Sequence, residues 1–161
     1  MEKSVRQQIE KIVVNAGIGR LSQQGQFEEK ILPAVNKEFS VITGQKALTR
    51  PAKKSIAGFK IRTGQVIGLK TTLRQKRMED FFARLVNLAL PRVKDFRGLD
   101  LKNIDERGNL NIGFREQNVF PEIDMEKSKV NFGIQVTIVP RNKNREAAID
   151  LYRRLGLPLK K

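Results

Sequence analysis

Alternating apolar and polar residues predict the strands of this chain. Between residues 66 and 74, Leu69 and Leu73 alternate with Lys70 and Thr72. Successive side chains of a strand point to opposite faces, so this pattern predicts one face in the core and one polar, basic face. The same alternation predicts strands at residues 110–114 and 130–138, and a short β-branched run predicts another at residues 9–14.

Apolar residues at helical spacing predict three main helices. The clearest spans residues 78–89 and is closed by Pro91. A second pattern covers residues 27–42, but Pro33 lacks the N–H that a helix interior needs, so we expect the true helix to begin near Leu32. In the third, Asn144 is placed to cap the N-terminus, and a glycine and a proline after residue 155 end it.

Helices interspersed among alternating strands predict an α+β fold. No long linker or repeat interrupts residues 1–161, so we expect a single domain. Strands with one polar face are typical of antiparallel sheets that are covered on one side only. The prediction is an antiparallel sheet of about five strands with helices packed on one face.

The charge of the chain indicates an acidic partner. It has 32 Lys and Arg against 17 Asp and Glu, a formal net charge of +15. Such an excess opposes the compact state unless a polyanion neutralises it, which favours nucleic acid. The chain has no Cys and no His, which excludes disulfides, the usual zinc sites and the Ser-His-Asp triad. We therefore predict that the protein is not an enzyme and binds no metal or cofactor. Because no apolar segment is long enough to span a membrane, we expect a cytoplasmic protein without membrane contact.

The positive charge is concentrated between Glu38 and Glu79. No acidic residue occurs there, while ten basic residues do: Lys46, Arg50, Lys53, Lys54, Lys60, Arg62, Lys70, Arg74, Lys76 and Arg77. A solvated face normally mixes the two signs of charge, so this acid-free segment predicts contact with RNA phosphates. Its middle part has two glycines and little periodicity, which indicates an exposed loop in which Phe59 either stacks on a base or anchors the loop in the core.

A second cluster of charge is acidic. Glu116, Glu122, Asp124 and Glu126 lie close together in sequence and allow a metal site or an acid–base pair. They lack the spacing of any known ligand motif, so an acidic edge that faces solvent or another protein is the preferred interpretation.

Several blocks of sequence resemble one family, the bacterial ribosomal protein L5 family. They occur in the family's order and spacing from about Ile9 to the C-terminus, at residues 44–46, 53–62, 72–74, 91–98 and 114–124. The resemblance implies a ribosomal, non-enzymatic protein of the large subunit that binds 5S rRNA and anchors it in the central protuberance. It also implies neighbours there: 23S rRNA, other 5S-binding ribosomal proteins, P-site tRNA, and a small-subunit head protein at an intersubunit bridge. Members usually begin with a helical extension, and we expect this extension to be missing from the chain.

By position in these motifs, the resemblance assigns three groups of site residues. The 5S rRNA contacts would be Asn15, Gln45, Lys46, Thr72 and Arg74. The loop facing tRNA would present Lys53, Lys54, Ser55, Phe59, Lys60 and Arg62. The contact with the small-subunit head would involve Glu116, Glu122 and Asp124.

Two other functions fit the same composition. A free-standing RNA-binding regulator or chaperone would share the charge but would bind many RNAs with little preference. An RNA-modifying or RNA-cleaving enzyme would have to use Lys, Arg, a carboxylate or Tyr152 as its acid–base groups, and no motif supports one.

Overall fold

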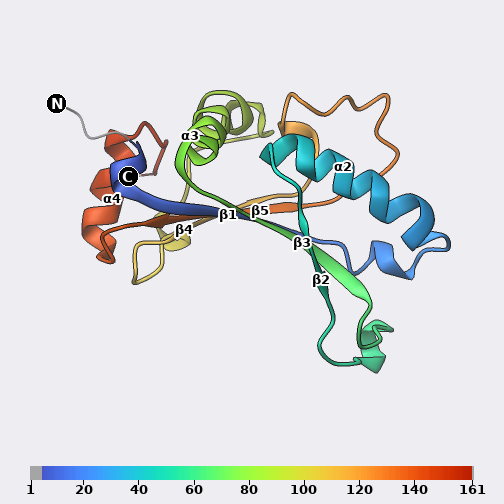
Figure 1. Cartoon of the computed structure of the whole chain (residues 1–161). Coiled ribbons are helices and arrows are strands. Elements are labelled where there is room, and N and C mark those ends of the chain that lie inside the picture. Colours follow the sequence, from blue (N-terminus) through green and yellow to red (C-terminus); the bar gives the residue numbers. More distant parts are fainter. Residues whose placement is uncertain (1–4, 161) are drawn as a thin grey trace.

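The computed structural model describes residues 5–160, and one antiparallel sheet forms its centre (Figure 1). The five strands lie in the order β2-β3-β1-β5-β4. Their bounds are Ile9–Gly17 for β1, Leu48–Pro51 for β2, Val66–Leu73 for β3, Leu110–Phe114 for β4 and Ile134–Pro140 for β5. The helices are α1 (Val5–Gln8), α2 (Leu32–Thr43), α3 (Gln75–Arg84) and α4 (Arg145–Arg154).

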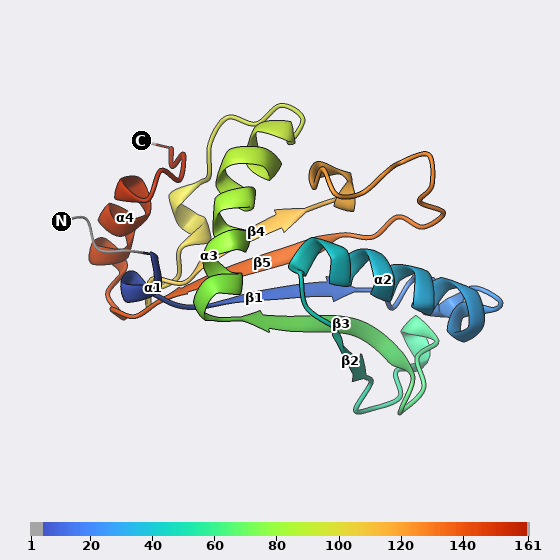
Figure 2. The ribbon, with the colours of Figure 1, turned by 45° about the horizontal axis from the view of Figure 1, so that its top comes forward.

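Each strand of the sheet's centre has one buried and one accessible face. In β1, which is the central strand, Ile12, Val14 and Ala16 are fully buried, while Val13 and Asn15 between them are half-buried. The buried residues pack with α2 and α3, which lie side by side over this face (Figure 2). At the same core, Phe120 contacts the rings of Phe81 and Phe114, with centroids 6.0 and 5.6 Å apart. The predicted α+β fold, with helices on one face of an antiparallel sheet, is confirmed.

The second helix starts where its proline predicts. Residues Phe27–Ile31 form a wider π-helical turn, and the regular helix α2 begins at Leu32 with Pro33 in its first turn. A first-turn N–H has no helical partner, so proline costs nothing there. Gly44 ends the helix in the left-handed conformation (φ 68°), which glycine adopts without strain.

Three strands differ from the prediction: β1 extends past residue 14 to Gly17, β5 starts later than expected, and β2 was not predicted. The strand predicted at residues 130–138 begins at Ile134, because the backbone before it bonds to a side chain instead of a neighbouring strand. The N–H of Phe132 donates to the side-chain oxygen of Gln117 at 3.1 Å, and the side-chain nitrogen of Gln117 donates to the carbonyl oxygen of Val130 at 2.6 Å. The edge strand β2 carries no alternating pattern because all four of its residues are exposed.

The last helix, α4, lies at the end of the sheet where β1 begins. The side chain of Asn144 accepts a hydrogen bond from the N–H of Ala147 at 3.1 Å, so the predicted N-cap is confirmed. One helical turn, α1, precedes β1, and the prediction about a longer helical extension lies outside the described residues. No helix within residues 5–160 has both the length and the apolar character needed to cross a bilayer.

Candidate nucleic-acid interface

The face of the sheet opposite α2 and α3 carries rows of polar side chains, and we call it the open face. Strand register places Asn15 of β1 between Lys70 of β3 and Gln135 of β5. In the next row, Thr72 and Thr137 flank Val13. Further members are Leu48 and Arg50 on β2 and Asn111 on β4. Neighbouring strands of a sheet lie about 4.8 Å apart, so each row offers donors and acceptors at close spacing.

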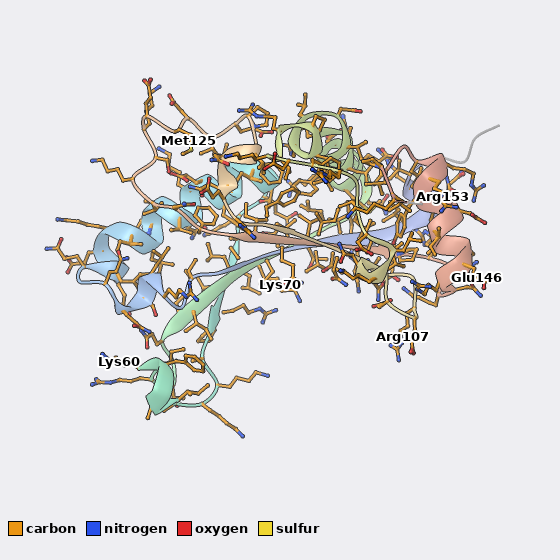
Figure 3. All side chains as sticks on the ribbon, turned by 180° about the vertical axis from the view of Figure 1, so that it is seen from behind. Lys60, Lys70, Arg107, Met125, Glu146 and Arg153 are labelled. Carbon is orange, nitrogen blue, oxygen red and sulfur yellow. The ribbon has the colours of Figure 1, made fainter. Side chains whose placement is uncertain are left out.

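Lys70 is the basic residue at the centre of this face. It projects from the side of the sheet opposite the helices (Figure 3). On the other side of β1, the Thr137 hydroxyl donates to the side-chain amide oxygen of Asn111 at 2.7 Å, so β4 and β5 hold that part of the face in a fixed arrangement. A flat, polar surface with a central cation suits the sugar–phosphate backbone and base edges of folded RNA.

The structure brings Gln45 and Thr72, which are 27 residues apart, into contact. The Gln45 amide nitrogen donates to the Thr72 carbonyl oxygen at 3.4 Å, and the Arg77 guanidinium donates to the Gln45 amide oxygen at 3.1 Å. An amide has two N–H donors and two acceptor lone pairs, so Gln45 keeps half of its capacity for a ligand. Lys46 beside it is exposed. These residues form one group at the β3 edge of the open face.

The ten cations of the acid-free segment are almost entirely uncompensated. All are exposed except the half-buried Lys70. Within residues 5–160, Arg74 is the only one of the ten that pairs with a carboxylate, at 3.9 Å from Glu10. Glu10 is also bonded by Lys143 at 3.0 Å, and this hydrogen bond holds the pKa of Glu10 below its usual value. The remaining nine positive charges are free to bind phosphate.

The predicted tRNA-facing loop is the connection between β2 and β3, and it extends away from the sheet (Figure 1). Lys60 lies at its tip (Figure 3), and all six assigned side chains are exposed: Lys53, Lys54, Ser55, Phe59, Lys60 and Arg62. Phe59 is 65% exposed, so the alternative that it anchors the loop in the core is wrong. An aromatic ring kept in solvent is available to stack on a base.

Two glutamines attach this loop to the turn that follows β1. The Gln23 side chain donates to the carbonyl oxygen of Phe59 at 2.6 Å. The Gln65 side chain donates to the carbonyl and hydroxyl oxygens of Ser22, at 3.1 and 2.9 Å. Within the loop, Ile56 and Ile61 pair in an antiparallel bridge. These bonds give the exposed loop a defined conformation close to the end of β1.

The three acidic residues assigned to the small-subunit contact, Glu116, Glu122 and Asp124, do not act as one group. The carboxylate of Glu122 forms an ion pair with Arg84, and its second oxygen is buried. Glu116 is exposed and accepts from Asn118 at 2.6 Å. Asp124 is exposed and pairs with Lys127 at 3.1 Å, and this bond lowers the pKa of the Asp124 carboxyl. Glu116 and Asp124 can therefore face a partner, while Glu122 holds its loop against α3.

The remaining acid–base group, Tyr152, is structural. Its side chain is fully buried, and its hydroxyl donates to the carbonyl oxygen of Gly108 at 2.6 Å. The carbonyl oxygen of Ile138 is a second acceptor, 3.2 Å from the hydroxyl. Burial raises the pKa of the Tyr152 hydroxyl, so it stays protonated. Within the described residues, no three acidic side chains gather in a way that would hold a metal ion.

Two family models together match almost the whole chain. "Ribosomal protein L5" matches residues 6–62, and the model of the C-terminus of the same ribosomal L5 family matches residues 66–159. The chain belongs to the ribosomal protein L5 family. In this L5 chain the two matched segments build one sheet, because β1 from the first lies between β3 and β5 from the second. Membership of a family of ribosomal proteins confirms the predicted family and its non-enzymatic class.

Curated relatives of this L5 chain agree with the family models. Large ribosomal subunit protein uL5 of Fusobacterium nucleatum is 47% identical over 153 residues, which cover 95% of this chain and 81% of the relative. Those of Syntrophomonas wolfei and Halothermothrix orenii are each 45% identical, over 94% and 93% of this chain and 83% and 82% of the relatives.

The open face of this L5 chain contains residues that the motif-based assignment left out. Gln135 lies beside the assigned Asn15, and Thr137 and Asn111 belong to the next row, which contains the assigned Thr72. Their signal was present in the sequence, because they occupy the polar positions of the two alternating strands. The alternation alone did not say that β5 lies next to β1, with β4 on the far side of β5.

Proposed function

We propose that this chain is a structural component of the large ribosomal subunit that binds 5S rRNA through its open face and anchors it in the central protuberance. The observation that carries the proposal is the row of Lys70, Asn15 and Gln135 on the open face, together with the scarcity of carboxylate partners for the cations of residues 46–77 within the described part of the chain. The cations offset phosphate repulsion, and the neutral polar side chains fix the register of the RNA. The relatives' name, large ribosomal subunit protein uL5, supports the subunit assignment.

The same proposal assigns the other surfaces. The contacts with 5S rRNA are made by Asn15, Gln45, Lys46, Thr72 and Arg74. The protein also has 23S rRNA and the other 5S-binding ribosomal proteins as neighbours. The loop with Lys53, Lys54, Ser55, Phe59, Lys60 and Arg62 faces P-site tRNA, which its exposure and positive charge support. Glu116 and Asp124 face a basic protein of the small-subunit head, with Glu122 in a supporting role through Arg84.

The test compares binding of 5S rRNA with that of an unrelated structured RNA of equal length, over a salt titration. The variant Asn15→Ala/Lys70→Ala removes the centre of the open face. The matched control is Asn36→Ala/Lys37→Ala, which removes the same residue types from α2 on the opposite side. We expect the open-face variant to lose about 10- to 100-fold in 5S affinity, with a salt slope lower by about one, and the control to bind as wild type.

Two results would count against the proposal. Equal binding of both RNAs by the wild-type protein would favour the free-standing, nonspecific RNA binder. A preference for 5S rRNA that both double variants retain would place the binding site outside the open face.

A further inference from the structure

A cleft lies where the open face meets the β2–β3 loop. It has a volume of about 620 Å³, within the range of pockets that hold small organic ligands. Three segments line it: the end of β1 with its following turn, the loop tip, and the residues just before β5 and just after β4. The residues that matter for its chemistry are Gly17, Arg20, Phe59, Arg115, Asn131 and Gly133.

Strand parity makes this cleft a continuation of the open face. Gly17 lies two residues beyond Asn15 on β1, so it belongs to the same face. Gly133 directly precedes β5 and Arg115 directly follows β4, at the end of the sheet where Gly113 pairs with Gln135, and Asn131 nearby is exposed. An RNA that covers the row of Asn15 and Gln135 would therefore reach the cleft without a change of direction.

The floor of the cleft lacks side chains. A Cβ atom added at Gly17 would meet nothing within 4 Å, and the backbone there does not need a positive φ. Gly17 pairs with Gly68 of β3, so two glycines occur side by side at this end of the sheet. The absence of a side chain at Gly17 leaves room for a flat group to approach the backbone.

Three of the polar side chains around the cleft are unpaired in the described part of the chain, while Gln23 there donates to Phe59. Across residues 5–160, the side chains of Arg20, Arg115 and Asn131 form no hydrogen bond or ion pair, and no acidic residue lines the cleft. Two guanidinium groups favour an anionic polymer, and the Asn131 amide offers both a donor and an acceptor to a base edge.

An aromatic ring stands at the rim. Phe59 is 65% exposed, and its backbone is held beside the cleft by the 2.6 Å bond from Gln23. Unpaired bases bind proteins mainly by stacking on such rings, with hydrogen bonds to their edges.

We propose that this cleft binds one unpaired nucleobase, stacked on Phe59, from an RNA that contacts the open face or the β2–β3 loop. The inference rests on the proposed RNA-binding function and adds a site for a single base to it. Arg20 and Arg115 hold the flanking phosphates, and Asn131 contacts the edge of the base.

The first experiment titrates the isotope-labelled full chain with adenosine 5′-monophosphate and, separately, with ribose 5-phosphate, which lacks the base. We expect the nucleotide to shift the NMR signals of the Gly17 and Gly133 amides and of the Phe59 ring. The variant Gly17→Leu, which fills the cleft, should abolish these shifts. Gly25→Leu, at an exposed glycine that also has nothing within 4 Å of its Cβ position, should retain them. The same shifts with ribose 5-phosphate, or none with the nucleotide, would overturn the base site.

The second experiment identifies which RNA supplies the base, by ultraviolet cross-linking of Phe59 to 5S rRNA or to tRNA. We expect Gly17→Leu to weaken binding of that RNA roughly 5- to 100-fold with no change of salt slope, since stacking involves no phosphate. A cross-link to neither RNA would overturn the proposal. The two proposals can fail separately. If the nucleotide shifts the NMR signals of the cleft but the protein binds 5S rRNA and unrelated RNA equally, the base site is supported and the 5S rRNA assignment is rejected.

Discussion

At the scale of single residues, Thr71 contributes an unpaired polar atom to the core side of β3. Its side chain is 3% exposed, and its hydroxyl oxygen has no hydrogen-bond partner. The neighbouring Thr72 points to the open face. Burial of an unpaired hydroxyl costs about 1–3 kcal/mol, so β3 is less stable than its apolar pattern implies.

We predict that Thr71→Val stabilises the protein by about 1 kcal/mol, because valine has nearly the same shape and no hydroxyl. Urea unfolding would measure the change. Thr72→Val on the opposite face of the strand is the matched control: it should leave stability nearly unchanged and weaken RNA binding. A lower stability for Thr71→Val would mean that the hydroxyl has a partner, such as a buried water.

At the scale of elements, the turn before β4 is organised by one carboxylate. Asp105 accepts hydrogen bonds from the N–H of Arg107 at 2.9 Å and from the N–H and side chain of Asn109, both at 2.8 Å. Burial would raise the pKa of Asp105, but the hydrogen bonds from Asn109 and Arg107 outweigh it and lower the pKa below its ordinary 3.8.

A lowered pKa makes the turn sensitive to acid. The folded state then binds a proton less readily than the unfolded chain, so the stabilisation is complete above pH 3.8 and is lost as the pH falls through the folded-state pKa. We predict that Asp105→Asn is less stable than wild type at pH 7 and that the difference shrinks towards pH 2. Urea unfolding at several pH values would test this. The control Glu126→Gln removes an exposed carboxylate that accepts no hydrogen bond within residues 5–160 and should show no such trend.

Elements with strong periodicity could be predicted from the sequence, and elements held by side chains could not. The alternation of residues indicated β3 and β4 directly, because burial of one face produces that pattern. Pro33 indicated the start of α2, because a proline has no backbone N–H to donate. The start of β5 could not be predicted, because the Gln117 amide replaces the strand partner there. The edge strand β2 has no buried face, so it carries no pattern.

Part of the candidate site could likewise be predicted from the sequence, and part could not. The basic segment and the polar strand faces were visible in the sequence, since charge and alternation are local properties. The contact of Gln45 with Thr72, and the cleft between Phe59 and Arg115, depend on which strands are neighbours. Strand order is a property of the whole chain that no local pattern contains.

At the scale of the whole molecule, the net charge of +15 opposes the folded state. We predict that raising sodium chloride from 0.05 to 0.5 M increases the melting temperature by about 3 °C, because the salt screens repulsion among exposed cations. The loop variant Lys53→Glu/Lys60→Glu lowers the net charge by four and should show a smaller increase. A melting temperature that falls with salt would mean that attractive ion pairs dominate instead.

The strand order also bears on how the protein is made. The central strand, β1, is synthesised first, but its two neighbours end at residues 73 and 140 of a 161-residue chain. Pairing across such separations forms slowly, and the side of β1 that pairs with β5 has no strand partner until residue 140 has been translated. During this time the acid-free segment has already emerged and carries its ten cations in an unfolded chain. We therefore expect the nascent protein to need protection by a chaperone, or early capture by its RNA, until β5 has been released and the sheet can close.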